Sequence, residues 1–114
     1  GAFEMISEKT KIDPMKIFEK ALDTAAPTVE IRPRRVGGAN FQIPFPVPDF
    51  RRKTLAFRWI IAAALAKKGK PMAEKLAEEL IDASKGEGAA IKKKMDVHRM
   101  AEANKAYAHF AKYG

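Results

Sequence analysis

The segment from Thr28 to Pro46 constrains the fold of this chain most, because its apolar residues alternate with polar ones instead of recurring at helical spacing. Prolines at positions 33, 44, 46 and 48 have no N–H to donate to a strand ladder, so these strands cannot lie inside a wide sheet. The pair Gly37 and Gly38 allows the positive φ angles that a tight reversal needs. The pattern therefore predicts a protruding, two-stranded antiparallel β-ribbon whose tip spans residues 34–40.

The rest of the chain has helical periodicity. Asp13 followed by Pro14 is a good helix start, and apolar residues then recur at helical spacing up to a stop before Pro27. At the N-terminus, Phe3 and Ile6 have no capping residue ahead of them, so we expect a first helix that is truncated. The predicted fold class is mainly α: a single helical domain over residues 1–114, with about five helices and the ribbon. After the first helix, the predicted helices span about Pro14 to Ala25, Phe50 to Lys68, Met72 to Ser84 and Ala89 to Asn104, the last fraying through Lys105 to His109.

Two of these helices have faces that can be assigned from spacing. In the helix from Phe50 we expect the buried stripe to contain Leu55, Trp59, Ala62 and Ala66. The helix from Met72 is the only acidic one, and we expect its acidic residues to face water or a basic protein neighbour. Its inward residues are predicted to be Met72, Leu76, Leu80 and Ile81, and its outward ones Glu74, Glu78, Glu79 and Asp82.

Several function classes have no support in the sequence. The absence of cysteine excludes a thiolate metal site or a cysteine nucleophile. His98 and His109 lack the converging ligands that a metal requires, and Ser7 and Ser84 lie in no nucleophile motif. The longest apolar run, residues 60–66, is far below the roughly 20 residues that span a bilayer. We therefore predict no catalytic residue, no metal or other cofactor, no small-molecule substrate and no membrane partner.

The charge of the chain points to a polyanion as partner. The formal net charge is +8 and the sequence pI is about 9.8, and structured RNA is the favoured polyanion. Cations in the first turns of a helix oppose its dipole, which suggests that they serve a partner outside the fold. The predicted RNA-binding residues are Arg34, Arg35, Gly37 and Gly38 at the ribbon tip, Arg51, Arg52, Lys53 and Arg58 after it, and Lys92, Lys93, Lys94, Arg99 and Lys105 near the C-terminus.

Each of these residues also has a structural interpretation. Arg34 and Arg35 could be solvated turn residues. Three successive lysines, residues 92–94, span about 300° of a helix, so only one or two of them can meet a phosphate row. Trp59 could stack on a base, although core packing is favoured. Glu102 could orient Arg99 beside His98, or form an ion pair.

Several motifs resemble, in order and spacing, the small-ribosomal-subunit protein S-seven family of bacteria and organelles. They are Asp13 to Leu22, Arg34 to Gly38, Arg51-Arg52, Arg58-Trp59 and Asp96 to Ala106. The resemblance implies a helical domain with a protruding β-ribbon that binds the 3′ major domain of small-subunit rRNA and helps to assemble the head. It also implies that the ribbon lies near exit-site tRNA and mRNA, with other head proteins as neighbours. Family members carry a basic N-terminal arm and a first helix upstream of the residues matching 1–10, which we expect this chain to lack.

The resemblance implies a ribosomal location, in the cytoplasm or in an organelle matrix or stroma. A second hypothesis is a DNA-binding architectural protein that uses the ribbon as a basic minor-groove arm. Composition alone does not separate the two hypotheses, whereas the order of the motifs favours the ribosomal one.

Overall fold

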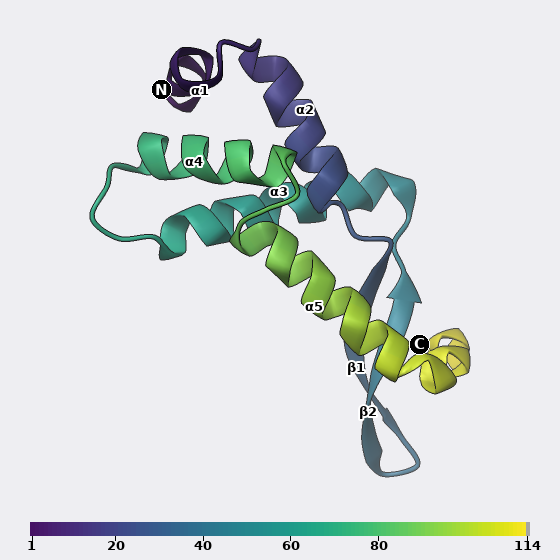
Figure 1. Cartoon of the computed structure of the whole chain (residues 1–114). Helices are drawn as coiled ribbons and strands as arrows, with labels where there is room; N and C mark the ends of the chain where they lie inside the picture. Colours follow the sequence, from purple (N-terminus) through teal and green to yellow (C-terminus); the bar gives the residue numbers. More distant parts are fainter. Residues whose placement is uncertain (114) are drawn as a thin grey trace.

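Six helices and one pair of strands make up the computed structural model, which describes residues 1–113 and the side chains up to residue 110 (Figure 1). The prediction of a mainly helical chain with a two-stranded ribbon is confirmed. The elements are α1 (Ala2–Thr10), α2 (Pro14–Ala25), β1 (Val29–Val36), β2 (Ala39–Pro46), α3 (Asp49–Ala66), α4 (Met72–Ser84), α5 (Ala89–Ala103) and the 3-10 helix η1 (Lys105–Tyr113).

The hydrophobic core lies among the helices, where α4 contacts α1, α2, α3 and α5. Alanine supplies seven of the twelve residues of the buried cluster, and its small side chain lets the helices approach closely. The burial of each larger aliphatic side chain contributes about 1.5–3 kcal/mol. The buried cluster comprises Ile6, Ile17, Ala21, Ala25, Ala26, Ala56, Ile60, Ala77, Leu80, Ala83, Ala90 and Ile91.

Helix α2 begins and ends where its sequence signals predict. The backbone N–H of Met15 donates to Asp13 Oδ1 at 3.0 Å, so the aspartate caps the helix, and Pro14 takes the first helical position. Ala25 is the last helical residue, two positions before Pro27.

The predicted stripe of α3 is right at Leu55, which is buried, and wrong for its other three residues. Ala62 and Ala66 are exposed, Trp59 is half-buried, and the fully buried residues are Ala56, Ile60 and Ala64. These three recur every four residues, and α2 and α4 pack against this helix. The alanine-rich sequence offers apolar residues on every side of α3, so spacing alone could not select the buried face.

Glu79 corrects the expectation that the acidic side of α4 faces water. Its side chain is 1% exposed, and its Oε1 accepts a hydrogen bond of 2.9 Å from the backbone N–H of Ala90. Lys67 Nζ lies 3.4 Å from Glu79 Oε2. Glu79 therefore satisfies a first-turn N–H group of α5 and pairs with the cation that follows α3. The neighbouring Glu78, which is 24% exposed, forms ion pairs with Lys9, Lys67 and Lys70.

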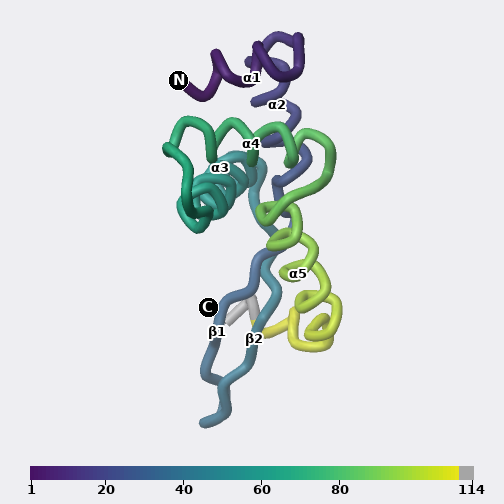
Figure 2. The backbone as a smooth tube through the Cα atoms, turned by 60° about the vertical axis from the view of Figure 1, so that its left-hand side comes forward, coloured from purple at the N-terminus to yellow at the C-terminus, as the bar shows by residue number. Residues whose placement is uncertain are grey.

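The strands pair antiparallel, with Val29 opposite Pro46 at the base and Val36 opposite Ala39 at the tip. Gly37 and Gly38 have φ values of 59° and 85°, as the reversal requires. The ribbon extends away from the helical body (Figures 1 and 2). The molecule measures 55 × 28 × 19 Å and its radius of gyration is 16.4 Å, against about 13 Å for a compact chain of this length.

The ribbon is not free along its whole length, because α5 packs along β1 and η1 packs against β2 (Figure 2). The ring of Phe41 lies 4.9 Å from that of Tyr107 and 5.4 Å from that of Phe110, centroid to centroid. The segment predicted to fray thus forms a 3-10 helix. With three residues per turn, Tyr107 and Phe110 share the side that faces the ribbon.

Candidate nucleic-acid interface

Two of the predicted RNA-binding arginines hold the base of the ribbon. Arg51 Nε donates to Glu30 Oε2 at 3.0 Å, and Arg52 Nε donates to the carbonyl oxygen of Pro27 at 3.2 Å. Glu30 also accepts from Arg32 at 2.9 Å. Burial on its own would raise the pKa of Glu30, but hydrogen bonds and charge from Arg32 and Arg51 outweigh burial and lower this pKa. Arg51 and Arg52 are therefore partly used inside the fold.

His98 of α5 contacts the start of the ribbon, and Lys94 of the same helix contacts the last turn of α2. The backbone N–H of Thr28 donates to His98 Nε2 at 3.2 Å, and Lys94 Nζ donates to the carbonyl oxygen of Thr24 at 2.8 Å. Burial, followed by the charges of Lys94 and Arg52, lowers the pKa of His98. Burial and then Arg52 also lower the pKa of Lys94. Because Nε2 of His98 accepts a hydrogen bond, the ring proton of the neutral imidazole is on Nδ1.

The two tip arginines have different surroundings. The Arg34 guanidinium lies 5.3 Å from the centre of the Phe45 ring, and its buried Nε has no hydrogen-bond partner in the described part of the chain. Arg35, opposite Asn40, is exposed. Open space surrounds the glycine pair beside them. Arg35 is therefore exposed as the sequence predicted, whereas Arg34 is only partly exposed.

The remaining predicted cations are exposed, and they differ in whether an acidic side chain pairs with them. Arg58 and Lys92 are exposed and have no acidic partner among the described residues. Lys93 lies 5.9 Å from the centre of the half-buried Trp59 ring. The other three form exposed ion pairs, which contribute little and open easily. These pairs are Lys53 with Asp23 at 3.7 Å, Arg99 with Asp96 at 3.3 Å and Lys105 with Glu102 at 2.9 Å.

The pairing around Glu102 settles one alternative left open by the sequence. Glu102 pairs with Lys105, whereas Arg99 pairs with Asp96, so Glu102 does not orient Arg99. His98 instead binds the ribbon backbone.

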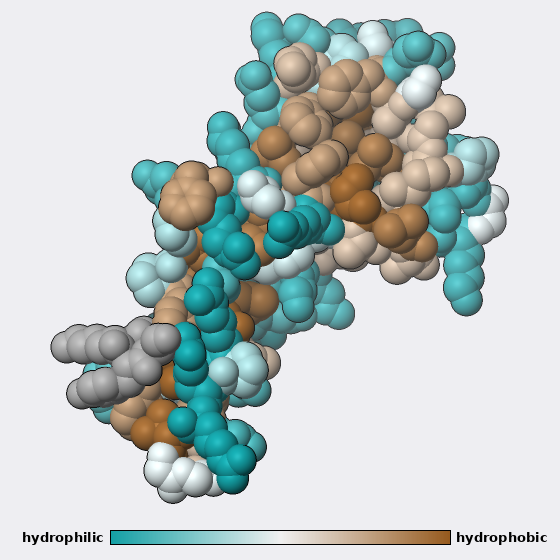
Figure 3. Space-filling model, turned by 180° about the vertical axis from the view of Figure 1, so that it is seen from behind, coloured by the Kyte–Doolittle hydropathy of each residue, from teal (hydrophilic) through white to brown (hydrophobic). Residues whose placement is uncertain are grey.

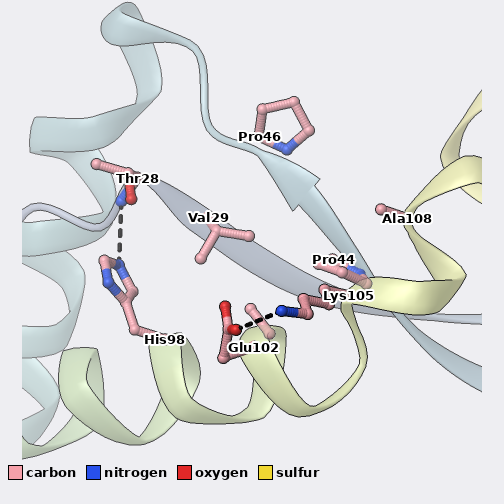
Figure 4. A pocket seen from close by; sticks show the side chains of 9 residues that line it. Thr28, Val29, Pro44, Pro46, His98, Glu102, Lys105 and Ala108 are labelled. Atoms are coloured by element: carbon pink, nitrogen blue, oxygen red, sulfur yellow. Dashed lines mark hydrogen bonds and ion pairs between the residues drawn. The ribbon is translucent and has the colours of Figure 1, made fainter.

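Sequence reasoning missed a cleft between the base of the ribbon, α5 and η1 (Figure 4). Its volume is about 460 Å³, and Val29, Pro44 and Pro46 of the ribbon form one wall. His98, Glu102 and Lys105 provide the polar groups, with Glu102 and Lys105 joined as an ion pair in Figure 4. In the sequence the prolines indicate only that the strands lie in no wide sheet, and no local signal shows that they face a histidine about 50 residues later in the chain.

The surface of the helical body is more hydrophobic than that of the ribbon on the face shown in Figure 3. Figure 3 shows hydrophobic side chains gathered over the body, while hydrophilic side chains run along the ribbon on the same face. Large apolar side chains exposed on body elements include Phe3 of α1, with 42% exposure, and Phe57 and Leu65 of α3, with 41% and 63%. The predicted cations cluster instead on the ribbon, the first half of α3, α5 and η1.

The described residues form neither a metal site nor a membrane-spanning helix. No cluster of three or more histidine, aspartate or glutamate side chains there could hold a metal ion. Within the same part of the chain, every helix is too short or too polar to cross a membrane.

Known proteins of a single family match nearly the whole length of this chain. The model of the family described as ribosomal protein S7p/S5e matches residues 1–105. The small ribosomal subunit protein uS7 of Kosmotoga olearia is 63% identical over 109 residues, which cover 96% of this chain and 70% of that protein. The uS7 proteins of Thermotoga maritima and Magnetococcus marinus are 59% and 56% identical over 110 residues, covering 96% of this chain and 71% and 70% of theirs.

Proposed function

Because the chain belongs to the ribosomal protein S7p/S5e family, we propose that it is a structural, non-enzymatic component of the small ribosomal subunit. In this proposal residues 1–114 act as one RNA-binding domain on the 3′ major domain of the rRNA and help to assemble the head. The observation that carries the proposal is a set of exposed cations beside a projecting ribbon, on a chain of net charge +8.

The cations divide into two groups with different proposed roles. Arg58 and Lys92, together with Lys53, Lys93, Arg99 and Lys105, are exposed and would meet rRNA phosphates. Arg51 and Arg52 would chiefly hold the base of the ribbon against the body, and Lys94 would chiefly hold the end of α2 against α5, because each already donates to a group inside the protein. Backbone contacts supply most of the affinity of such an interface, so binding should weaken as salt rises.

The ribbon tip would serve a different contact. Arg35 and the open glycine pair lie at the far end of a 55 Å molecule, beyond the helical body. We propose that this tip lies near exit-site tRNA and mRNA. A guanidinium suits that place, because it pairs with phosphate in a bidentate manner and stacks on exposed bases. Arg34 would mainly stiffen the tip through its contact with Phe45.

The experiment that tests this proposal is a competition between nucleic acids at matched salt. The chain is titrated with a folded fragment of the 3′ major domain of rRNA and with a bent DNA duplex carrying the same number of phosphates. We expect the rRNA fragment to bind at least tenfold more tightly, because the cations would fit a folded RNA surface. Equal affinities would support the architectural DNA-binding hypothesis instead, and an unstructured RNA of the same length controls for charge alone.

A further inference from the structure

We propose that the cleft at the base of the ribbon binds an unpaired guanine base of the RNA. The inference rests on the proposed function and adds a specific base-recognition site to an interface otherwise built from phosphate contacts. The cleft is formed by two strands and two helices that are far apart in sequence, from Thr28 to Ala108 (Figure 4).

The shape and lining of the cleft suit a flat, largely apolar group. Its volume of about 460 Å³ lies in the range of pockets that hold small ligands, roughly 300–1,000 Å³. Val29 lies directly opposite Pro46 in the strand pair, and both line the cleft together with Pro44. The His98 ring lines it from α5. Unpaired RNA bases are bound in this way, between apolar surfaces and an aromatic or imidazole ring.

The charges in the cleft select a base over a phosphate. Glu102 places at the cleft a carboxylate whose charge balances that of Lys105, and the lowered pKa of His98 keeps the imidazole neutral near pH 7. Lys105 is the only cation among the lining residues, and Glu102 already neutralises it. A neutral ligand with hydrogen-bond donors on its edge therefore fits better than an anion.

The carboxylate further selects guanine among the bases. An ionised carboxylate only accepts hydrogen bonds, and its two oxygens can accept from two parallel donors. Guanine presents two adjacent donors, the N1–H and the 2-amino group, whereas adenine and cytosine each present one amino group. The Glu102 and Lys105 side chains are 73% and 74% exposed, so their ion pair can open and leave the carboxylate for the base.

Binding of tetranucleotides to the full chain tests the inference, because the electrostatic contribution is the same for each. We expect 5′-UUGU-3′ to bind about fivefold more tightly than 5′-UUAU-3′, the lower end of discrimination by a bidentate contact. The inosine form, which lacks only the 2-amino group, should fall between them. In ¹H–¹⁵N NMR spectra the amides of Thr28, Val29 and Glu102 should shift with the guanine form.

Three variants test whether the preference for guanine over adenine arises in the cleft. Glu102→Gln should reduce it below twofold, because an amide offers one acceptor and not two. Ala108→Trp, at an exposed position that lines the cleft, should fill the cleft and abolish it. Ala106→Trp is the matched control, since Ala106 is exposed on the same 3-10 helix but does not line the cleft.

Two results would overturn the inference: equal binding of the guanine and adenine forms, or a guanine preference that persists in folded Ala108→Trp. If the rRNA fragment still binds preferentially, either result contradicts the guanine site without contradicting the proposed function. Loss of the preference for folded rRNA over DNA would remove the proposed function itself.

Discussion

Glu79 and Gly88 form a contact on which the junction of α4 and α5 depends. Gly88 has a φ of 93°, and a Cβ atom at that position would lie 2.9 Å from Glu79 Oε1. The same oxygen accepts the Ala90 N–H, so it cannot move away without leaving that donor unsatisfied. Gly88 is therefore required both for its backbone conformation and for the space that its missing side chain leaves.

Gly88→Ala and Gly86→Ala compare a position that is restricted both by space and by a backbone conformation almost exclusive to glycine, with ψ at 176°, with a position that has open space. Gly86 has a similar φ of 77°, but no heavy atom lies within 4 Å of its Cβ position. Gly86→Ala should lower the free energy of unfolding by about 1 kcal/mol, the cost of a left-handed conformation for alanine. Gly88→Ala should cost about 1–2 kcal/mol more, measured by urea denaturation. Equal costs would show that neither the backbone conformation nor the neighbours of Gly88, Glu79 and Asp82, restrict this position further.

His98 makes the attachment of the ribbon sensitive to pH. Its pKa in the folded chain is lowered by burial, by Lys94 and by Arg52, below the ordinary value of 6.5. Glu102, one turn along α5, is the nearby acidic group and is paired with Lys105. Because the unfolded chain binds a proton more readily than the folded chain, the stability present above pH 6.5 is lost as pH falls toward the folded pKa.

We therefore predict that the free energy of unfolding falls between pH 6.5 and pH 5 in the wild type, and falls less in His98→Gln. Urea denaturation at fixed ionic strength measures both. His109→Gln is the control, since His109 is exposed and accepts nothing from the ribbon backbone. A wild-type profile as flat as that of His98→Gln would contradict this account.

At the scale of elements, the ribbon is held by contacts between residues that are distant in sequence. Arg51 and Glu30 are 21 positions apart, and His98 and Thr28 are 70 positions apart. The aromatic contact of Phe41 with Tyr107 ties β2 to η1 over a similar separation. The direction of the ribbon therefore depends on α3, α5 and η1 together.

Arginine substitutions on α3 test whether Arg51 stabilises the fold while Arg58 does not. Arg51→Ala leaves Glu30, which is 12% exposed, with Arg32 as its one remaining partner, and should cost about 1–2 kcal/mol of stability. Arg58→Ala should change stability by less than about 0.5 kcal/mol, because Arg58 is exposed and unpaired among the described residues. Thermal unfolding monitored by circular dichroism measures both, and similar losses for the two variants would argue against a structural role for Arg51.

Local signals in the sequence predicted the elements well, because each acts within a few residues. The Asp13 cap, the proline stops and the glycine pair gave the bounds of α2 and the ribbon, and the period of two gave its strands. The contacts of Arg51, Lys94 and Glu79 were not predictable, since they depend on which helix faces come together. The same reason explains the missed cleft and the docking of η1.

For the whole molecule, the central claim is that cations exposed beside the ribbon bind folded rRNA through its phosphates. The family resemblance seen in the motifs is confirmed by the match over residues 1–105, while the individual contact residues stay a prediction. The claim names particular cations, because other exposed lysines, such as Lys16 and Lys20 of α2, are not part of the proposed interface.

The most direct test is the salt dependence of binding to the 3′ major domain fragment. Removing two phosphate contacts with Arg58→Ala and Lys92→Ala should weaken binding and reduce the slope of log Kd against log salt by about 1.5. Lys16→Ala with Lys20→Ala removes the same charge from α2 and should leave the slope unchanged. An unchanged slope in the first double variant, or equal reductions in both, would contradict the proposed interface.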